Sequence, residues 1–182
     1  MLPTSPDHLF AYLDSLGITH GTVWHPAVFT VEEAQAQRDR DHLVGGFTKN
    51  LFLRDKKGAL FLVVVPEDAT IELKSLHRLL GATGRFSFAS PELMRELLGV
   101  EPGSVTPFAA INDRAGRVTV VLDAAMMAHE VLNFHPLTNT GTTTISRPGL
   151  VKFLEATGHP PQIEPVSALE MDSKTEHATR PS

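Results

Sequence analysis

The strongest structural signal in the chain comes from residues 48–65, which read TKNLFLRDKKGALFLVVV. Thr48–Arg54 has the composition of a strand, and the following Asp55-Lys56-Lys57-Gly58 has that of a tight turn. Ala59–Val65 is apolar at every position, which is typical of a strand that is covered on both faces. The pattern predicts a β-hairpin whose second strand is central in its sheet.

Helix signals lie on both sides of this hairpin. Ser5-Pro6-Asp7 predicts a helix start with Gly17 as its end, and Thr30 with Glu33 predicts a capping box for a helix through about His42. Apolar spacing and end signals predict three further helices, in residues 73–80, 91–98 and 148–157. The remaining predicted strands are Ile18–Trp24, Arg85–Phe88, a second hairpin of Phe108–Ile111 with Val118–Leu122, and the pair Val131–His135 and Thr142–Ile145.

The order of these segments defines the expected fold class. Helices and hairpins interleave without a steady βαβ rhythm, which favours an α+β (mixed α/β) fold with a mostly antiparallel or mixed sheet surrounded by helices. We expect one domain over residues 1–162. Residues 163–182 hold prolines, charges and few large apolar side chains, and we expect them to form a poorly packed C-terminal tail.

Composition excludes several classes of protein. The 182 residues include no cysteine, which removes thiolate catalysis, disulfides and Cys-ligated metals. The longest apolar run, Ala59–Val65, is far shorter than a membrane-spanning helix, and Met1–Asp7 lacks the features of a signal peptide. We therefore expect a cytoplasmic protein that makes no membrane contact. A net charge of −5 argues against general coating of nucleic acid.

The usual catalytic and cofactor motifs are absent. No GxSxG, HExxH, P-loop or GxGxxG is present. The nine histidines show no paired short spacing, so the sequence predicts no metal site and no cofactor.

Three polar segments remain as candidate sites. Strand alternation places Lys49 with Leu51 and Leu53, so its ammonium group either reaches solvent at the sheet edge or points into a pocket. Gly103–Pro107 is either an ordinary turn or a loop whose backbone approaches a ligand. Asn133–Thr140 is dense in hydrogen-bonding side chains, which polar turn chemistry also explains.

Together and in this order, these segments resemble the YbaK/ProX family of aminoacyl-tRNA deacylases, related to the editing domain of bacterial prolyl-tRNA synthetases. The resemblance runs from about His25 to Pro160, and its branch is similar to the free-standing ProX type. It rests on the stretches His25–Thr30, Thr48–Leu53, Phe86–Ser90, Pro102–Phe108, Ile111–Asp113 and Asn133–Leu137.

The resemblance implies an activity and a site. The implied activity is hydrolysis of the ester between alanine and mischarged tRNA(Pro). The apolar pocket of a synthetase gains only about 1–3 kcal/mol per methylene, so it cannot firmly reject a smaller amino acid. A second, smaller site that admits alanine and excludes proline is therefore needed. The implied catalytic residues are Lys49, Gly103 and His135, with the neighbouring ribose hydroxyl helping to activate water. We expect the substrate to contact His25, Val28, Phe29, Thr30, Asn50, Ser104, Val105, Thr106, Pro107, Asn133 and Phe134.

The local charges are compatible with a tRNA partner. Residues 38–57 carry six Lys or Arg against three Asp, and residues 69–90 carry three against one Glu. Positive charge in these segments suits a few phosphate contacts near the site. The expected tRNA-binding residues are Arg38, Arg40, Lys56, Lys57, Lys74 and Arg78.

Other readings of the sequence remain open. The chain is alternatively a non-catalytic module that binds aminoacyl-tRNA or a synthetase, or a deacylase for cysteine or serine. Prolyl-tRNA synthetase and an elongation factor are further candidate partners. The polar segment Val31–His42, followed by Gly45-Gly46, is either a mobile lid over the pocket or a rigid solvated helix.

Overall fold

The predicted hairpin forms the centre of the sheet in the computed structural model, which describes residues 2–169. Strand β2 (Gly46–Arg54) pairs antiparallel with β3 (Leu60–Pro66). The turn between them is organised by the buried carboxylate of Asp55, which accepts the backbone N–H groups of Lys57, Ala59 and Thr83 at 2.9, 2.8 and 3.0 Å. These bonds, that of Thr83 first, hold the pKa of Asp55 below its ordinary value.

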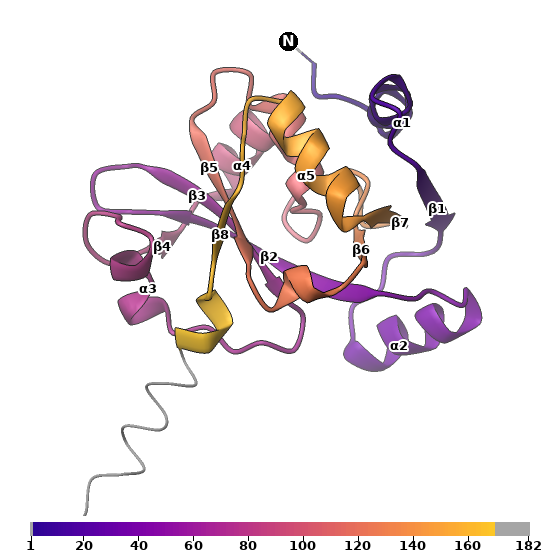
Figure 1. Ribbon diagram of the computed structural model, residues 1–182, viewed down its shortest axis with the longest axis horizontal. Coiled ribbons are helices and arrows are strands. Elements are labelled where there is room, and N and C mark those ends of the chain that lie inside the picture. The colour runs from indigo at the N-terminus through magenta and orange to yellow at the C-terminus, as the bar shows by residue number, and fades with distance from the viewer. Residues whose placement is uncertain (1, 170–182) are drawn as a thin grey trace, which may run out of the picture.

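The sheet is mixed, as expected from the sequence (Figure 1). Its strand order is β1-β7-β6-β2-β3-β5-β8, with β4 pairing to β2 beside this path. The pairs β2–β6, β3–β5 and β5–β8 are parallel, and the other pairs are antiparallel. The remaining strands are β1 (His20–Trp24), β4 (Ser87–Phe88), β5 (Val118–Asp123), β6 (Val131–Phe134), β7 (Gly141–Ser146) and β8 (Gln162–Glu164).

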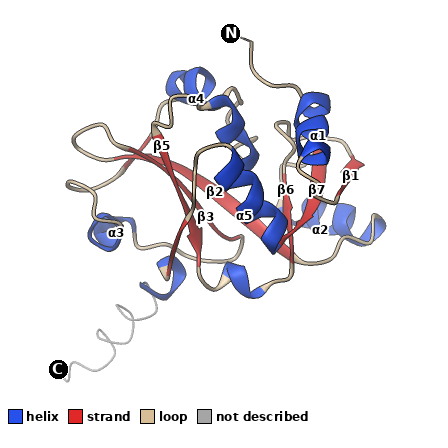
Figure 2. Ribbon diagram, turned by 45° about the horizontal axis from the view of Figure 1, so that its top comes forward, coloured by secondary structure: helices blue, strands red, loops and turns tan. Residues whose placement is uncertain are grey.

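Both faces of β3 are buried, which confirms its predicted central place. Leu60, Leu62 and Val64 belong to the larger core, which also takes in residues of α1 (Pro6–Ser15), α4 (Pro91–Leu98) and α5 (Arg147–Ala156). Phe61, Val63 and Val65 face a smaller core on the side of α3 (Leu73–Leu79). Figure 2 shows α5 lying across the sheet.

The helix starts are those that the capping residues predict. Ser5, Thr30 and Ser90 each cap a helix with the side-chain oxygen. At α2 (Val31–Arg40), Thr30 Oγ1 accepts the N–H of Glu33 at 3.1 Å, and the Glu33 carboxylate accepts that of Thr30 at 3.2 Å. Gly99 ends α4 in the left-handed conformation, with φ 62°.

The predicted strand at Phe108–Ile111 is wrong. Residues Pro107–Asn112 form a buried 3₁₀-helix, η1, so the second hairpin does not exist. Pro107 has no N–H for a strand ladder and has the backbone angle of a helix start, while the Thr106 hydroxyl accepts the N–H of Phe108. Strand β5 pairs instead with β3 and β8, which lie far from it in sequence.

The predicted domain end at residue 162 is also wrong. Residues 162–164 form β8 on the edge of the sheet, and Val166 is fully buried. The buried carboxylate of Asp123 accepts both the N–H and the hydroxyl of Ser167 at 2.9 Å. One apolar side chain and a few backbone bonds are enough to dock this segment. The rest of the predicted tail, residues 170–182, lies outside the described residues. Within residues 2–169 no helix is long and apolar enough to cross a membrane.

Candidate functional site

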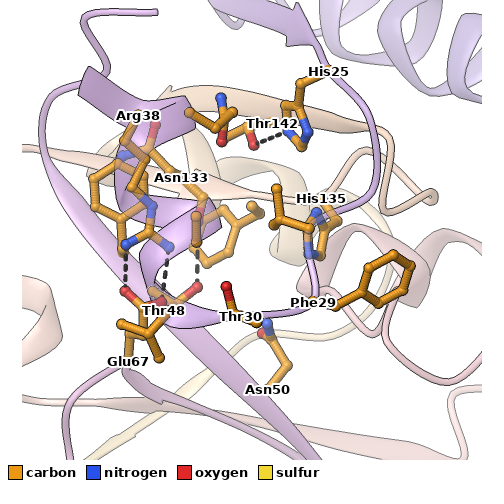
Figure 3. A pocket seen from close by; sticks show the side chains of 16 residues that line it. His25, Phe29, Thr30, Arg38, Thr48, Asn50, Glu67, Asn133, His135 and Thr142 are labelled. Carbon is orange, nitrogen blue, oxygen red and sulfur yellow. Dashed lines mark hydrogen bonds and ion pairs between the residues drawn. The ribbon is translucent and has the colours of Figure 1, made fainter. Parts of the chain in front are cut away.

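A cavity of about 300 Å³ lies where α2, the loop after β1 and the meeting ends of β2 and β6 converge (Figure 3). Its wall combines histidine, threonine and amide side chains with aromatic and aliphatic ones. The lining residues are His25, Val28, Phe29, Thr30, Val31, Ala34, Gln37, Arg38, Phe47, Thr48, Asn50, Glu67, Asn133, Phe134, His135 and Thr142.

The floor of the cavity depends on a close approach of two backbone segments. β2 and β6 pair through Gly46 with Leu132 and Phe47 with Asn133. Gly45 enters this junction at φ +96°, and a Cβ there would lie 2.5 Å from the carbonyl oxygen of Val131. Only glycine fits such an approach without displacing backbone. Gly45 and Gly46, which follow the polar segment Val31–His42, therefore allow β2 to approach β6 closely enough to form the cavity floor.

Asn133 locks the same junction from the side of β6. Its Nδ2 donates to the carbonyls of Val44 and Gly46 at 2.8 and 3.2 Å, and its Oδ1 accepts the Thr144 hydroxyl at 2.7 Å. Asn133 lines the cavity, as the sequence predicts, but both of its polar atoms bind protein groups. Asn133 therefore holds the wall of the cavity in place, and its expected contact with substrate stays a prediction.

Hydrogen bonds fix the tautomers of two histidines in the wall. The Nδ1–H of His25 donates to the carbonyl of Pro26 at 2.9 Å, and its Nε2 accepts the Thr142 hydroxyl at 2.8 Å (Figure 3). The Nδ1–H of His135 donates to the carbonyl of Gly141 at 3.1 Å. A carbonyl only accepts, so in neutral His135 the lone pair belongs to Nε2. His25 is occupied by the protein, whereas His135 Nε2 is free to serve a ligand.

His135 is held in its neutral form by its surroundings. Burial lowers its pKa below the ordinary value, because the charged ring loses water. The Gly141 carbonyl acts in the opposite direction, while the charges of His25 and Arg38 lower the pKa further. The cavity therefore offers a neutral nitrogen acceptor at physiological pH.

Two more polar features border the cavity. The Asn50 side-chain oxygen is buried and has no hydrogen-bond partner among the described residues. Arg38 reaches from α2 to Glu67, with two N–H···O bonds of 2.6 and 2.8 Å, and its guanidinium lies 3.8 Å from the centre of the Phe47 ring. This bidentate pair joins α2 to the segment after β3.

The fold brings most of the predicted substrate-binding residues together. His25, Val28, Phe29, Thr30, Asn50, Asn133, Phe134 and His135 all line the cavity, as does Arg38. The Arg38 guanidinium is bound to Glu67, and its predicted tRNA contact stays a prediction.

Lys49 and the glycine loop are not in the cavity wall. Lys49 lies on the α3 side of β2 with Leu51 and Leu53, and its ammonium group donates to the carbonyl of Ala69. The neighbours Thr48 and Asn50, of opposite direction, line the cavity instead. The strand alternates as the sequence predicts, and the face that carries Lys49 is the one away from the cavity.

The glycine loop supports the cavity from behind. None of Gly103, Ser104, Val105, Thr106 or Pro107 lines it. The loop leads instead into Phe108, whose ring packs edge-on against that of Phe134, with the ring centres 5.8 Å apart. Phe134 lines the cavity, so the loop helps to hold this part of the cavity wall in place through Phe108.

The remaining basic residues do not form one patch. Arg40 ends α2, whereas Lys56 and Lys57 lie in the turn at the far end of the hairpin from Thr48. A strand rises about 3.3 Å per residue, so the eight residues from Thr48 to Lys56 span roughly 26 Å. Lys74 and Arg78 lie on α3, on the other side of the view from α2 (Figure 1). No cluster of three metal-binding side chains lies within residues 2–169.

Seven lining residues were not foreseen. They are Val31, Ala34, Gln37, Phe47, Thr48, Glu67 and Thr142. The sequence does hold a signal for two of them. Thr48 lies two positions before Asn50 and so on the same face of the strand, and Glu67 is an acidic residue just after a buried strand. Thr142 becomes visible only through the pairing of β7 with β1, which places it beside His25.

Comparisons with known proteins agree with this geometry. Residues 25–153 match the family described as aminoacyl-tRNA editing domain. The chain is 42% identical over 154 residues to the prolyl-tRNA synthetase associated domain-containing protein 1 of Danio rerio, covering 84% of this chain and 82% of that protein. It is 36% identical over 154 residues to the prolyl-tRNA editing protein ProX of Acetoanaerobium sticklandii, covering 83% and 91%.

A solved structure shares the fold. It is a crystallised candidate trans-editing enzyme for prolyl tRNA synthetase, with a TM-score of 0.67 and 23% identity, covering 90% of this chain and 98% of that one. The matched region holds the whole cavity wall, from His25 to Thr142. The chain therefore belongs to the aminoacyl-tRNA editing domain family, as a ProX-type member with aminoacyl-tRNA deacylase activity.

Proposed function

We propose that this protein hydrolyses the ester of alanine on mischarged tRNA(Pro), with the aminoacyl group in the cavity around His135. The relatives named for prolyl-tRNA editing support a proline tRNA as the carrier. The observation that carries the proposal is the small cavity with a neutral histidine acceptor, inside an editing domain. A cavity of about 300 Å³ suits a small aminoacyl group and its ribose.

In the proposed reaction, water attacks the ester carbonyl and the bond to the ribose oxygen breaks. The water oxygen forms the new bond to the carbonyl carbon, and one water proton ends on the ribose oxygen. The other proton passes to solvent when the carboxyl group of the released amino acid ionises. His135 Nε2 accepts a hydrogen bond from the α-ammonium group of the substrate and so sets its orientation. The Asn50 side chain lines the cavity, and in the proposed reaction its Nδ2–H donates to the ester carbonyl as negative charge develops there, while its buried Oδ1, unpartnered among the described residues, is left to accept from the substrate.

Lys49 is proposed as the cation that completes this site. Its support is the family resemblance together with its place between two lining residues, Thr48 and Asn50. To serve the substrate, its ammonium group exchanges the Ala69 carbonyl for the negative charge of substrate, which its flexible stem permits. The glycine loop contributes by supporting Phe134 through Phe108.

Phosphate contacts are proposed for Arg40, Lys56, Lys57, Lys74 and Arg78. Because these residues are spread over the molecule, they would meet the acceptor stem and not the single-stranded end alone. The partner is the acceptor end of tRNA(Pro) that carries alanine, with prolyl-tRNA synthetase or an elongation factor as further candidates. Such a substrate is used in the cytoplasm, where we place the protein.

One assay separates this function from a binding-only role. Ala-tRNA(Pro), Pro-tRNA(Pro) and Ala-tRNA(Ala) are incubated with the wild type and with Lys49→Ala, with and without EDTA. We expect loss of Ala-tRNA(Pro) alone, strong impairment by the substitution and no effect of EDTA. Intact Ala-tRNA(Pro) under wild-type protein would refute the proposal, and Cys-tRNA(Pro) and Ser-tRNA(Pro) test the other amino acids.

Lys152→Ala is a matched control for the lysine. Lys152, on α5 and outside the cavity, also donates its ammonium group to a backbone carbonyl, that of Leu16 at 2.6 Å. If Lys49 only tethers a loop, both variants lose a similar amount of stability and keep similar activity. A catalytic Lys49 predicts that Lys49→Ala alone loses kcat, with Lys49→Arg recovering only part of it.

A further inference from the structure

An aromatic side chain stands unburied at the mouth of the cavity. Phe29 is 84% exposed and yet lines the cavity, where Figure 3 shows its ring projecting outward beside His135. Among the described residues that line the cavity, it is the one aromatic side chain that is mostly open to water. An exposed phenyl ring at a binding site is a surface on which an apolar or aromatic ligand group can lie.

The backbone that carries this ring is fixed before any ligand arrives. The N–H of Phe29 donates to the Glu33 carboxylate at 2.8 Å, and the same oxygen accepts the N–H of Thr30. The Thr30 hydroxyl accepts in return from Glu33, which closes the capping box of α2. The backbone from which the ring projects is thus ordered in advance, which lowers the cost of ordering when a ligand binds.

The covalent structure of the proposed substrate brings a base to this position. The ester is carried by the terminal ribose of tRNA, and the terminal base is attached to the same sugar. An aminoacyl group held beside His135 therefore leaves that base at the cavity mouth, within one sugar of the Phe29 ring. Stacking on an aromatic side chain suits this base, because every base offers a flat face.

We propose that Phe29 is the stacking platform for the terminal base of the tRNA acceptor end. This inference rests on the proposed function and adds a base-binding subsite to it. The neighbouring charge is compatible with such a subsite, because the Glu33 carboxylate is bound to backbone N–H groups and Arg38 is paired with Glu67. Both of these nearby charges are therefore paired within the protein.

The test uses an uncharged acceptor minihelix of tRNA(Pro) with 2-aminopurine as its terminal base. Stacking quenches the fluorescence of this base, and anisotropy of a label at the other end gives the Kd. We expect the wild type and Phe29→Trp to quench the signal, whereas Phe29→Ala leaves it bright and binds about tenfold more weakly. Quenching by Phe29→Ala at saturation, or none by Phe29→Trp, would overturn the proposal.

Phe88→Ala is the matched control. Phe88 is also an exposed phenylalanine, at 62%, but it lies on β4 and outside the cavity wall. It should quench and bind like the wild type, and a loss equal to that of Phe29→Ala would refute a local role. The readout does not need turnover, so stacking without hydrolysis refutes the proposed function alone, and hydrolysis without stacking refutes only this subsite.

Discussion

Gly45→Ala tests whether the close approach of β2 to β6 builds the cavity. An alanine at φ +96° sits in the left-handed region, which costs about 1–2 kcal/mol, partly offset by about 0.4–1 kcal/mol from a less flexible unfolded chain. The new Cβ would also lie 2.5 Å from the Val131 carbonyl oxygen. Backbone there cannot rotate away as a side chain does, and such overpacking adds about 1–3 kcal/mol.

Gly116→Ala separates the two contributions. Gly116 also has a left-handed φ, +67°, but nothing lies within 4 Å of its would-be Cβ. We therefore expect this variant to lose about 1 kcal/mol and Gly45→Ala about 2–4 kcal/mol of the free energy of unfolding. Urea denaturation followed by circular dichroism measures both, provided that the m values agree.

The functional consequence is measured on the folded proteins. Displacement of β2 against β6 moves Phe47 and Asn133 in the cavity wall, so kcat/KM of Gly45→Ala should fall about tenfold or more. Gly116→Ala should deacylate at the wild-type rate. Equal stability losses in the two variants would refute the steric reasoning, and a fully active Gly45→Ala would refute the link to the cavity.

Three further predictions concern charge and packing. His135 has a lowered pKa when folded, so the unfolded chain binds its proton first, and the free energy of unfolding should fall as pH drops below about 6.5; a pH series of urea melts should show a smaller fall in His135→Asn. A double-mutant cycle of Arg38→Ala and Glu67→Ala should give a coupling of about 1 kcal/mol that shrinks with added salt, whereas a salt-independent value would contradict the ion pair. Val166→Ala should cost about 2 kcal/mol in urea melts, where a loosely attached tail predicts no loss.

The local parts of the fold are readable because their causes are local. The turn at Asp55–Gly58 and the uninterrupted apolar run after it fix the hairpin, and side-chain caps at Ser5 and Thr30 fix helix starts. The pairings of β3 with β5 and of β5 with β8 join distant segments, and no single segment records them. The same holds for Val166, one apolar residue in a polar stretch.

In the candidate site, too, local features can be predicted from the sequence and long-range contacts cannot. Asn133 and His135 are found from the sequence because they stand in a polar segment at a strand end, and His25 is found through the family resemblance. Their roles cannot be found in this way. The tautomer of His135 depends on a hydrogen bond to the Gly141 carbonyl, and the Asn133 side chain is hydrogen-bonded to groups of other segments, such as the Val44 carbonyl. Alternation correctly separates Lys49 from Asn50, but only tertiary structure tells which face holds the cavity.

The bond between His25 and Thr142 joins residues that are 117 positions apart, and it has a consequence for synthesis of the chain. Contacts of such long range form late, because a long loop must close before they contribute. A growing chain can already contain Phe29, Asn50 and the hairpin while it lacks the wall supplied by β6 and β7. The cavity wall is therefore complete only after the last third of the chain has been made.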